Sequence, residues 1–120
     1  GASLEIGLQV AEKLKNKGYQ LKLISMHTLK PVNETVFLKE VKDQSIIFTI
    51  EEHRISGGLA SIVAQLLFKT KGKMPQLQSF GVDDTYPGIT GHQDYLAAHH
   101  GLSTEKIYKK ILKKLEIGSK

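Results

Sequence analysis

Two acids, an imidazole and a glycine pair form the stretch of the sequence with the most potential for chemistry. Glu51, Glu52 and His53 follow an unbroken apolar run, and Gly57 and Gly58 come shortly after them. Carboxylates and imidazoles serve as general acids, general bases or metal ligands, and backbone amides at the start of a helix can face an anion. The pattern therefore leaves acid–base catalysis, metal binding and anion binding open at one place in the chain.

A simpler role competes with each of these possibilities. Adjacent loop residues seldom converge on one metal ion, and Gly57-Gly58 lacks the GxGxxG or GxxxxGK[ST] context of phosphate-binding loops. A hydrogen-bonded His53 at a domain interface fits the pattern better than a catalytic His53. We therefore predict interface or substrate-proximal positions at Glu51, Glu52, His53, Gly57 and Gly58, and we predict no catalytic residue, cofactor ligand or metal ligand.

The remaining acids and imidazoles give weaker signals. Asp83 and Asp84 follow a predicted strand, but a phospho-receiver domain needs its acidic pair after the first strand, so turn and capping roles are favoured. His99 and His100 would project about 100° apart on a helix, and His92 has no carboxylate partner at the spacing of a known metal-ligand pattern. The sequence contains no cysteine, which excludes disulfides and a thiol nucleophile and fits a cytoplasmic setting.

The elements that must position these residues alternate between helix and strand. Ser3 and Asn33 are predicted N-caps, and Gly18 is placed to end the first helix in a left-handed conformation. Gly101 is predicted to end one helix near the C-terminus, and Ser103 to cap the next. The predicted helices cover 4–17, 34–42, 59–68, 92–99 and 104–115, and the predicted strands cover Leu21–Met26, Ile46–Ile50 and Leu77–Val82.

This order of elements predicts an α/β fold. Strands separated by helices must pair in parallel through crossovers, which gives three α/β/α layers around a mainly parallel sheet. The unbroken run Ile46–Ile50 is typical of a strand that is covered on both faces. The chain opens directly on a helix and offers few strands for its helices. We therefore expect that one sheet strand is missing at the N-terminus, and that residues 1–120 are a single domain of a longer polypeptide.

Composition excludes several classes of protein. With 120 residues, 40% hydrophobic and 24% charged, the chain is long and apolar enough to bury a core, so wholesale disorder is excluded. Its longest apolar and β-branched stretch has five residues, far short of the roughly 20 apolar residues that span a bilayer, so no membrane partner is expected. The net charge of +5 could indicate nucleic acid, but Arg54 is the only arginine and the lysines are not interleaved with aromatic residues. The cluster at Lys106, Lys109, Lys110, Lys113 and Lys114 is interpreted as the solvent face of an amphipathic helix, and no nucleic-acid partner is expected.

Read in order, several short motifs resemble one known family. They are Gly-Ala-Ser-Leu-Glu-Ile at 1–6, Met-His-Thr-Leu-Lys-Pro at 26–31, Phe-Thr-Ile-Glu-Glu-His at 48–53, Gly-Gly-Leu-Ala-Ser at 57–61, Gly-Val-Asp-Asp at 81–84 and Gly-Leu-Ser at 101–103. Together they resemble the C-terminal domain of transketolases, especially the split form whose C-terminal section is a separate subunit, with 1-deoxy-xylulose-5-phosphate synthase as a close relative. The resemblance covers nearly the whole chain, and it leaves transketolase, that synthase and a dehydrogenase β-subunit open.

The resemblance implies a thiamine-diphosphate enzyme that transfers a two-carbon ketol unit between sugar phosphates, with magnesium on the cofactor's diphosphate. In that family the other two domains hold the cofactor at a dimer interface, and the third domain serves packing and assembly. We therefore expect no cofactor in this domain, the cofactor-binding domains or subunit as its partners, a homodimer in the full assembly, and no activity from the isolated chain. The alternative is a free-standing module that binds anions or nucleotides at the Gly57-Gly58 helix start.

Overall fold

The computed structural model describes residues 2–26, 33–52, 58–82 and 93–118, which form two compact units. The first unit, residues 1–23 with 82–120, contains helices α1 (Ala2–Asn16) and α4 (Gln93–Gly118). The second unit, residues 24–81, contains α2 (Glu34–Val41), β1 (Ile46–Glu52), α3 (Gly58–Leu67) and all but the last residue of β2 (Gln76–Val82).

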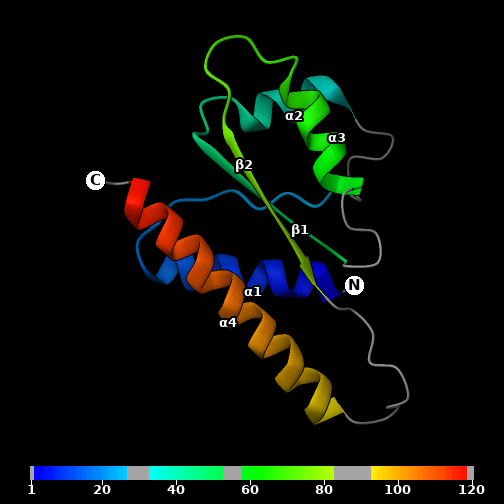
Figure 1. Ribbon diagram of the computed structural model, residues 1–120, viewed down its shortest axis with the longest axis vertical. Coiled ribbons are helices and arrows are strands. Elements are labelled where there is room, and N and C mark those ends of the chain that lie inside the picture. Colours follow the sequence, from blue (N-terminus) through cyan, green and yellow to red (C-terminus); the bar gives the residue numbers. More distant parts are fainter. Residues whose placement is uncertain (1, 27–32, 53–57, 83–92, 119–120) are drawn as a thin grey trace. The chain divides into compact units, whose positions relative to one another are not determined.

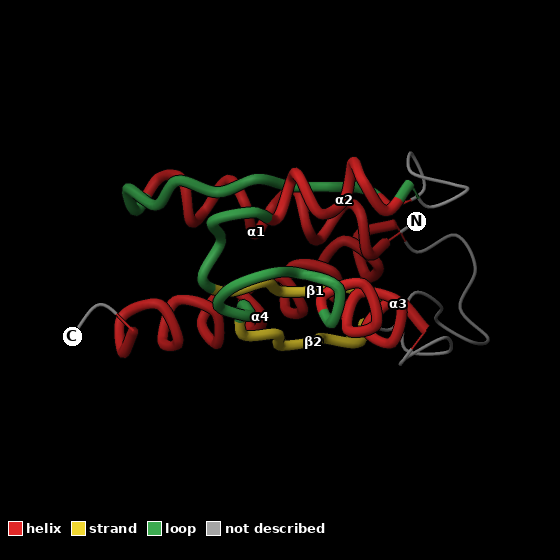
Figure 2. Tube along the Cα trace, turned by 90° about the horizontal axis from the view of Figure 1, so that it is seen from above, coloured by secondary structure: helices red, strands yellow, loops and turns green. Residues whose placement is uncertain are grey.

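The second unit is built on two hydrogen-bonded strands. β1 and β2 run in the same direction, with α3 between them in the sequence (Figure 1). The view from above shows the two strands side by side (Figure 2). A parallel pair needs a crossover connection, and a helix of ten residues supplies it here. The structure thus confirms the α/β class, the parallel sheet and the strands predicted at Ile46–Ile50 and Leu77–Val82.

The strand predicted at Leu21–Met26 is wrong. The structure gives this segment no strand hydrogen bonds, and Figure 2 draws the stretch after α1 as a loop. Leu21 and Leu23 are 41% and 45% exposed, so the segment does not bury these apolar side chains as a packed strand would. Strand preference reflects packing on a pleated surface. An apolar run therefore does not become a strand unless a neighbouring edge pairs with its backbone.

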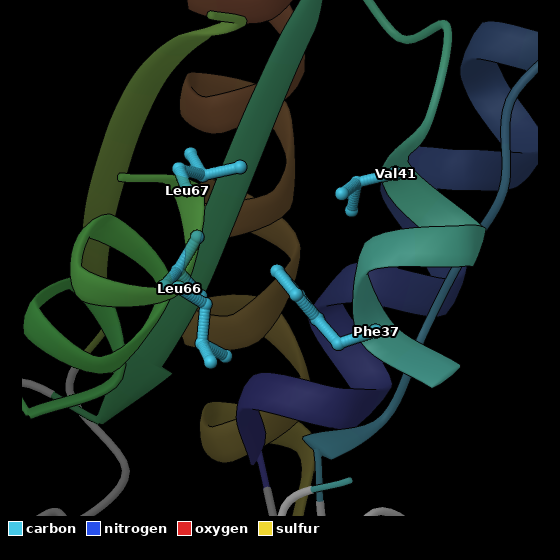
Figure 3. Packing of buried hydrophobic residues seen from close by; sticks show 5 residues of the cluster. Phe37, Val41, Leu66 and Leu67 are labelled. Atoms are coloured by element: carbon cyan, nitrogen blue, oxygen red, sulfur yellow. The ribbon is translucent and has the colours of Figure 1, made fainter. Parts of the chain in front are cut away.

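A cluster of buried side chains packs α2 and α3 together. Phe37 and Val41 come from α2, and Val63, Leu66 and Leu67 come from α3 (Figure 3). Partly buried residues of both strands, Ile47 and Leu77, pack against this cluster.

Asn33 caps α2 as predicted, because its side-chain oxygen accepts a hydrogen bond from the backbone N–H of Val36 at 3.1 Å. Successive strand residues point to opposite faces. Phe48 accordingly lies on the other face, stacked on Phe80 with 6.2 Å between ring centroids.

Helices α1 and α4 pack side by side in the first unit. Ile6, Val10 and Leu14 recur every four residues along α1 and are buried, as are Ile107 and Ile111 of α4. The prediction of two helices near the C-terminus is wrong, since α4 is continuous through Gly101 and Ser103. Glycine costs only about 1 kcal/mol inside a helix. One glycine is therefore a weak stop signal in a helix held by a buried stripe.

Of the two predictions for the ends of α1, one is wrong and one is confirmed. The helix already includes Ala2, so Ser3 lies inside it and the predicted Ser3 cap is wrong. At the other end Gly18 has φ +95°, as predicted. Its N–H donates to the carbonyl of Lys15 at 2.9 Å, and the N–H of Tyr19 donates to the carbonyl of Leu14 at 3.1 Å. This is the hydrogen-bond pair of a Schellman cap.

Within the residues that the structure describes, none of the helices has the length and apolar character needed to cross a lipid bilayer.

Replacing Gly18 by alanine should lower the free energy of unfolding by about 1–2 kcal/mol, because a side chain is strained at this positive φ. Nothing lies within 4 Å of the added Cβ, so the cost comes from the backbone and not from a clash. Gly58→Ala is the matched control, since Gly58 also has open space but lies in a helix with ordinary φ. Urea denaturation of both variants checks this, and equal stabilities of the two would contradict it.

Two buried threonines should respond oppositely to replacement by valine. Thr49 is 4% exposed, and its hydroxyl has no hydrogen-bond partner in the part of the chain that the structure describes. Thr104 is 2% exposed, and its hydroxyl donates to Oε1 of Gln9 at 2.6 Å. An unsatisfied buried polar group costs about 1–3 kcal/mol. Thr49→Val should therefore raise the free energy of unfolding by about 1 kcal/mol, whereas Thr104→Val should lower it. Thermal denaturation followed by circular dichroism measures both, and destabilisation by Thr49→Val would show that the Thr49 hydroxyl is satisfied.

Candidate functional site

The predicted site residues lie where β1 ends and α3 begins. Glu51 and Glu52 are the last two residues of β1, so they belong to the strand and not to the loop in which the sequence analysis placed them. Gly58 is the first residue of α3. His53 and Gly57 lie outside the described residues. The described part of the site therefore consists of two acids and the N-terminus of a ten-residue helix.

Glu51 binds the N-terminus of α3 with its carboxylate. Its Oε2 accepts a hydrogen bond of 2.7 Å from the backbone N–H of Leu59, the second residue of the helix. The first N–H groups of a helix have no partner within the helix, and they carry the positive end of its dipole. A carboxylate therefore satisfies both needs at this position. This contact explains how an acid can lie 5% exposed in the core of a small unit.

The two adjacent acids do not form a catalytic pair. Side chains alternate along a strand, so Glu51 shares a face with Ile47 and Thr49, whereas Glu52 lies on the other face. Glu52 is half-buried and takes part in an interaction of its own. Over the described ranges, with their gaps, no three acids, histidines or cysteines come close enough to hold a metal ion. The structure thus separates Glu51 and Glu52, which the sequence left together.

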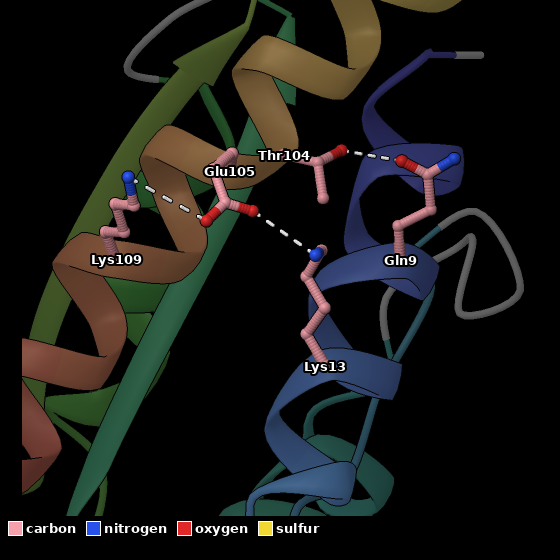
Figure 4. A network of polar contacts seen from close by, with 5 residues as sticks. All are labelled: Gln9, Lys13, Thr104, Glu105 and Lys109. Atoms are coloured by element: carbon pink, nitrogen blue, oxygen red, sulfur yellow. Dashed lines mark hydrogen bonds and ion pairs between the residues drawn. The ribbon is translucent and has the colours of Figure 1, made fainter.

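A second polar constellation, which the sequence analysis missed, joins α1 to α4. Lys13 pairs with Glu105 at 3.2 Å, and Glu105 also approaches Lys109 at 3.9 Å (Figure 4). Lys13 also lies over the ring of Tyr108. With the Gln9–Thr104 hydrogen bond, these contacts border a shallow hollow of about 320 Å³. Thr104 was predicted only as the residue after a helix cap. Thr104 lies one turn before Ile107 in the sequence, and this spacing could have shown that it shares the buried face of the helix. The spacing could not have shown that Gln9 is its hydrogen-bond partner.

Removing the Glu51 carboxylate should destabilise the second unit. Glu51→Ala leaves the first amides of α3 without this acceptor and should lower the free energy of unfolding by about 1–2 kcal/mol, the usual cost of losing an N-terminal cap. Glu51→Gln keeps an acceptor oxygen and loses only the charge, so it should cost about 0.3–1 kcal/mol. Glu12→Ala, at an exposed acid in the middle of α1, is the control and should stay within about 0.5 kcal/mol. If urea denaturation finds Glu51→Ala as stable as the original chain, the carboxylate is not a cap.

Comparison with known protein families identifies a match over most of the chain. A model of the family "Transketolase, C-terminal domain" matches residues 1–107, which include all of the described elements except the last turns of α4. No solved structure matches the chain.

Three relatives illustrate the likeness. The protein named "Putative transketolase C-terminal section" of Methanocaldococcus jannaschii is 32% identical over 97% of this chain and 35% of its own length. An apulose-4-phosphate transketolase subunit of Phocaeicola vulgatus is 30% identical over 93% of this chain and 35% of its own length. The 1-deoxy-D-xylulose-5-phosphate synthase of Francisella philomiragia is 31% identical over 96% of this chain and 18% of its own length. The chain thus spans about a third or less of these relatives, and it belongs to the transketolase C-terminal domain family.

Proposed function

We propose that this chain is the structural C-terminal domain of a thiamine-diphosphate-dependent, transketolase-like enzyme that transfers a two-carbon ketol unit between sugar phosphates. Its role is to dock against the cofactor-binding domains or subunit of the same enzyme. The observation that carries the proposal is the family match over residues 1–107. The names of two relatives, one a section and one a subunit, support a division of the enzyme into parts.

The described residues at the end of β1 do not fit thiamine diphosphate and magnesium. A diphosphate needs free backbone amides or cations, but the carboxylate of Glu51 occupies the α3 N-terminus. Magnesium prefers several oxygen ligands around one point, and the two neighbouring carboxylates lie on opposite faces of β1. The proposal therefore assigns the cofactor and its metal ion to the other domains of the enzyme.

The same contact argues against the alternative function. A free-standing anion or nucleotide module would use the α3 N-terminus as its binding site. A bound anion would have to displace a carboxylate that is 5% exposed and hydrogen-bonded at 2.7 Å. The helix start that the sequence offered as a phosphate site is therefore better understood as a joint between β1 and α3.

Docking is proposed at the carboxyl end of β1. Glu52 ends the strand on the face opposite Glu51, and His53 follows it in the sequence. In parallel sheets the residues that follow the strands lie along one edge, and this edge is the usual place for binding in open α/β folds. Glu52, His53 and the Gly57-Gly58 pair are thus the proposed contact residues. A cytoplasmic homodimer of the full assembly completes the proposal, and the lack of cysteine agrees with a reducing compartment.

Adding this chain to polypeptides that carry the cofactor-binding domains of the same enzyme should restore ketol transfer, measured with a coupled assay of sugar-phosphate formation. Neither preparation alone should turn over, because each holds only part of the assembly. Glu52→Ala should weaken complex formation at least tenfold, whereas Glu12→Ala on α1 should leave it unchanged. Full activity of the cofactor-binding polypeptides without this chain would contradict the proposal.

A further inference from the structure

Five lysines cover one face of the C-terminal half of α4. Lys106, Lys109, Lys110, Lys113 and Lys114 are all exposed, and we refer to them as the lysine face. At 100° per residue they span an arc of roughly 140°, which borders the side of the helix that buries Ile107 and Ile111. Between the first and the last lysine the face extends about 12 Å along the helix axis. It is therefore a compact and rigid array of positive charge.

The fold does not need this array. Lysines three and four residues apart repel one another along the helix, as do Lys106 with Lys110 and Lys110 with Lys114. The helix dipole does not explain them either, since it acts within the last turn and the last turn of α4 carries no basic residue. Lys109 approaches Glu105 at 3.9 Å, and the other four make no ion pair in the described part of the chain. The charge therefore works against the stability of α4, which points to a role outside the chain.

We propose that the lysine face is a docking surface for an acidic patch on the partner protein, namely the cofactor-binding domains or subunit of the enzyme. This inference rests on the proposed function, which requires a protein partner. Lys106, Lys110 and Lys114 repeat at an interval of about 6 Å, so a partner helix with carboxylates four residues apart would present its charges at the same interval.

A protein partner fits the array better than nucleic acid does. Glu105 precedes the first lysine and Glu116 follows the last, so negative charge brackets the array at both ends. A phosphate backbone would run past these glutamates, whereas an acidic patch of limited length fits between them. The face also has neither arginine for base contacts nor an aromatic residue on which a base could stack.

The lysine face accelerates association more than it tightens the complex. Exposed charges attract a complementary surface over about a Debye length, which is about 10 Å at 0.1 M salt, and they raise the rate of encounter. Individual exposed ion pairs add little to the affinity. The expected signature is therefore an association rate that falls with ionic strength, with a dissociation rate that hardly changes.

Stopped-flow association with the cofactor-binding polypeptides, at 20 mM and 300 mM salt, tests the inference. Lys106→Glu combined with Lys110→Glu and Lys114→Glu should slow association at low salt at least tenfold, and the three Lys→Gln changes should slow it to an intermediate degree. The matched control reverses three exposed lysines of the second unit, Lys39, Lys71 and Lys73, and should slow association less than twofold. Circular dichroism checks that each variant keeps its helix content.

The outcomes separate this inference from the proposed function. Suppose that the original chain associates and restores activity. If the Lys→Glu variant of the lysine face and the control variant of the second unit then slow association equally, or neither slows it, the lysine face is not the docking surface. If the lysine-face variant binds the partner normally but loses binding to a 20-base-pair DNA duplex, the face is a nucleic-acid site and the inference is overturned. If the original chain neither binds the cofactor-binding polypeptides nor restores activity, the proposed function fails, and this inference fails with it.

Discussion

The hydrogen bond from the Leu59 amide to the Glu51 carboxylate is the constraint on which the second unit depends. It ties the end of β1 to the first turn of α3, so the crossover helix begins at a fixed place relative to the strand that precedes it. From that start α3 directs Val63, Leu66 and Leu67 toward Phe37 and Val41 of α2. A buried charge is tolerated only when it is hydrogen-bonded, and here the partner is the amide end of a helix dipole.

This joint also decides how the end of β1 can be used. In open α/β folds the carboxyl ends of parallel strands are the usual place for ligands, and a helix N-terminus is the usual place for a phosphate. In this chain the protein's own carboxylate takes that position, while Glu52 turns to the opposite face. An edge of this kind suits contact with another protein surface better than chemistry, and this supports the docking role that we propose.

Local signals in the sequence predicted the elements that depend on local interactions. Asn33 as a cap, Gly18 as a terminator and the strand at Ile46–Ile50 are confirmed, because capping, positive φ and β-branched runs act within a few residues. The strand at Leu21–Met26 failed because pairing depends on a distant edge, and the break at Gly101 failed because packing of α4 against α1 outweighs one glycine. The sequence analysis placed a candidate site at Glu51 and Glu52, which stays a prediction, and it could not show that their side chains separate, since that follows from how far β1 extends. His53 and Gly57 stay predictions.

The central claim is that the α3 N-terminus is a structural joint already filled by Glu51. The most direct measurement follows the backbone amide of Leu59 by nuclear magnetic resonance while thiamine diphosphate and magnesium are added to this chain. Our account predicts that the Leu59 resonance does not move and that its hydrogen exchange stays slow, because the carboxylate keeps the amide. A saturable shift of that resonance, with its neighbours in α3, would show that the helix start binds the diphosphate itself and would contradict the account.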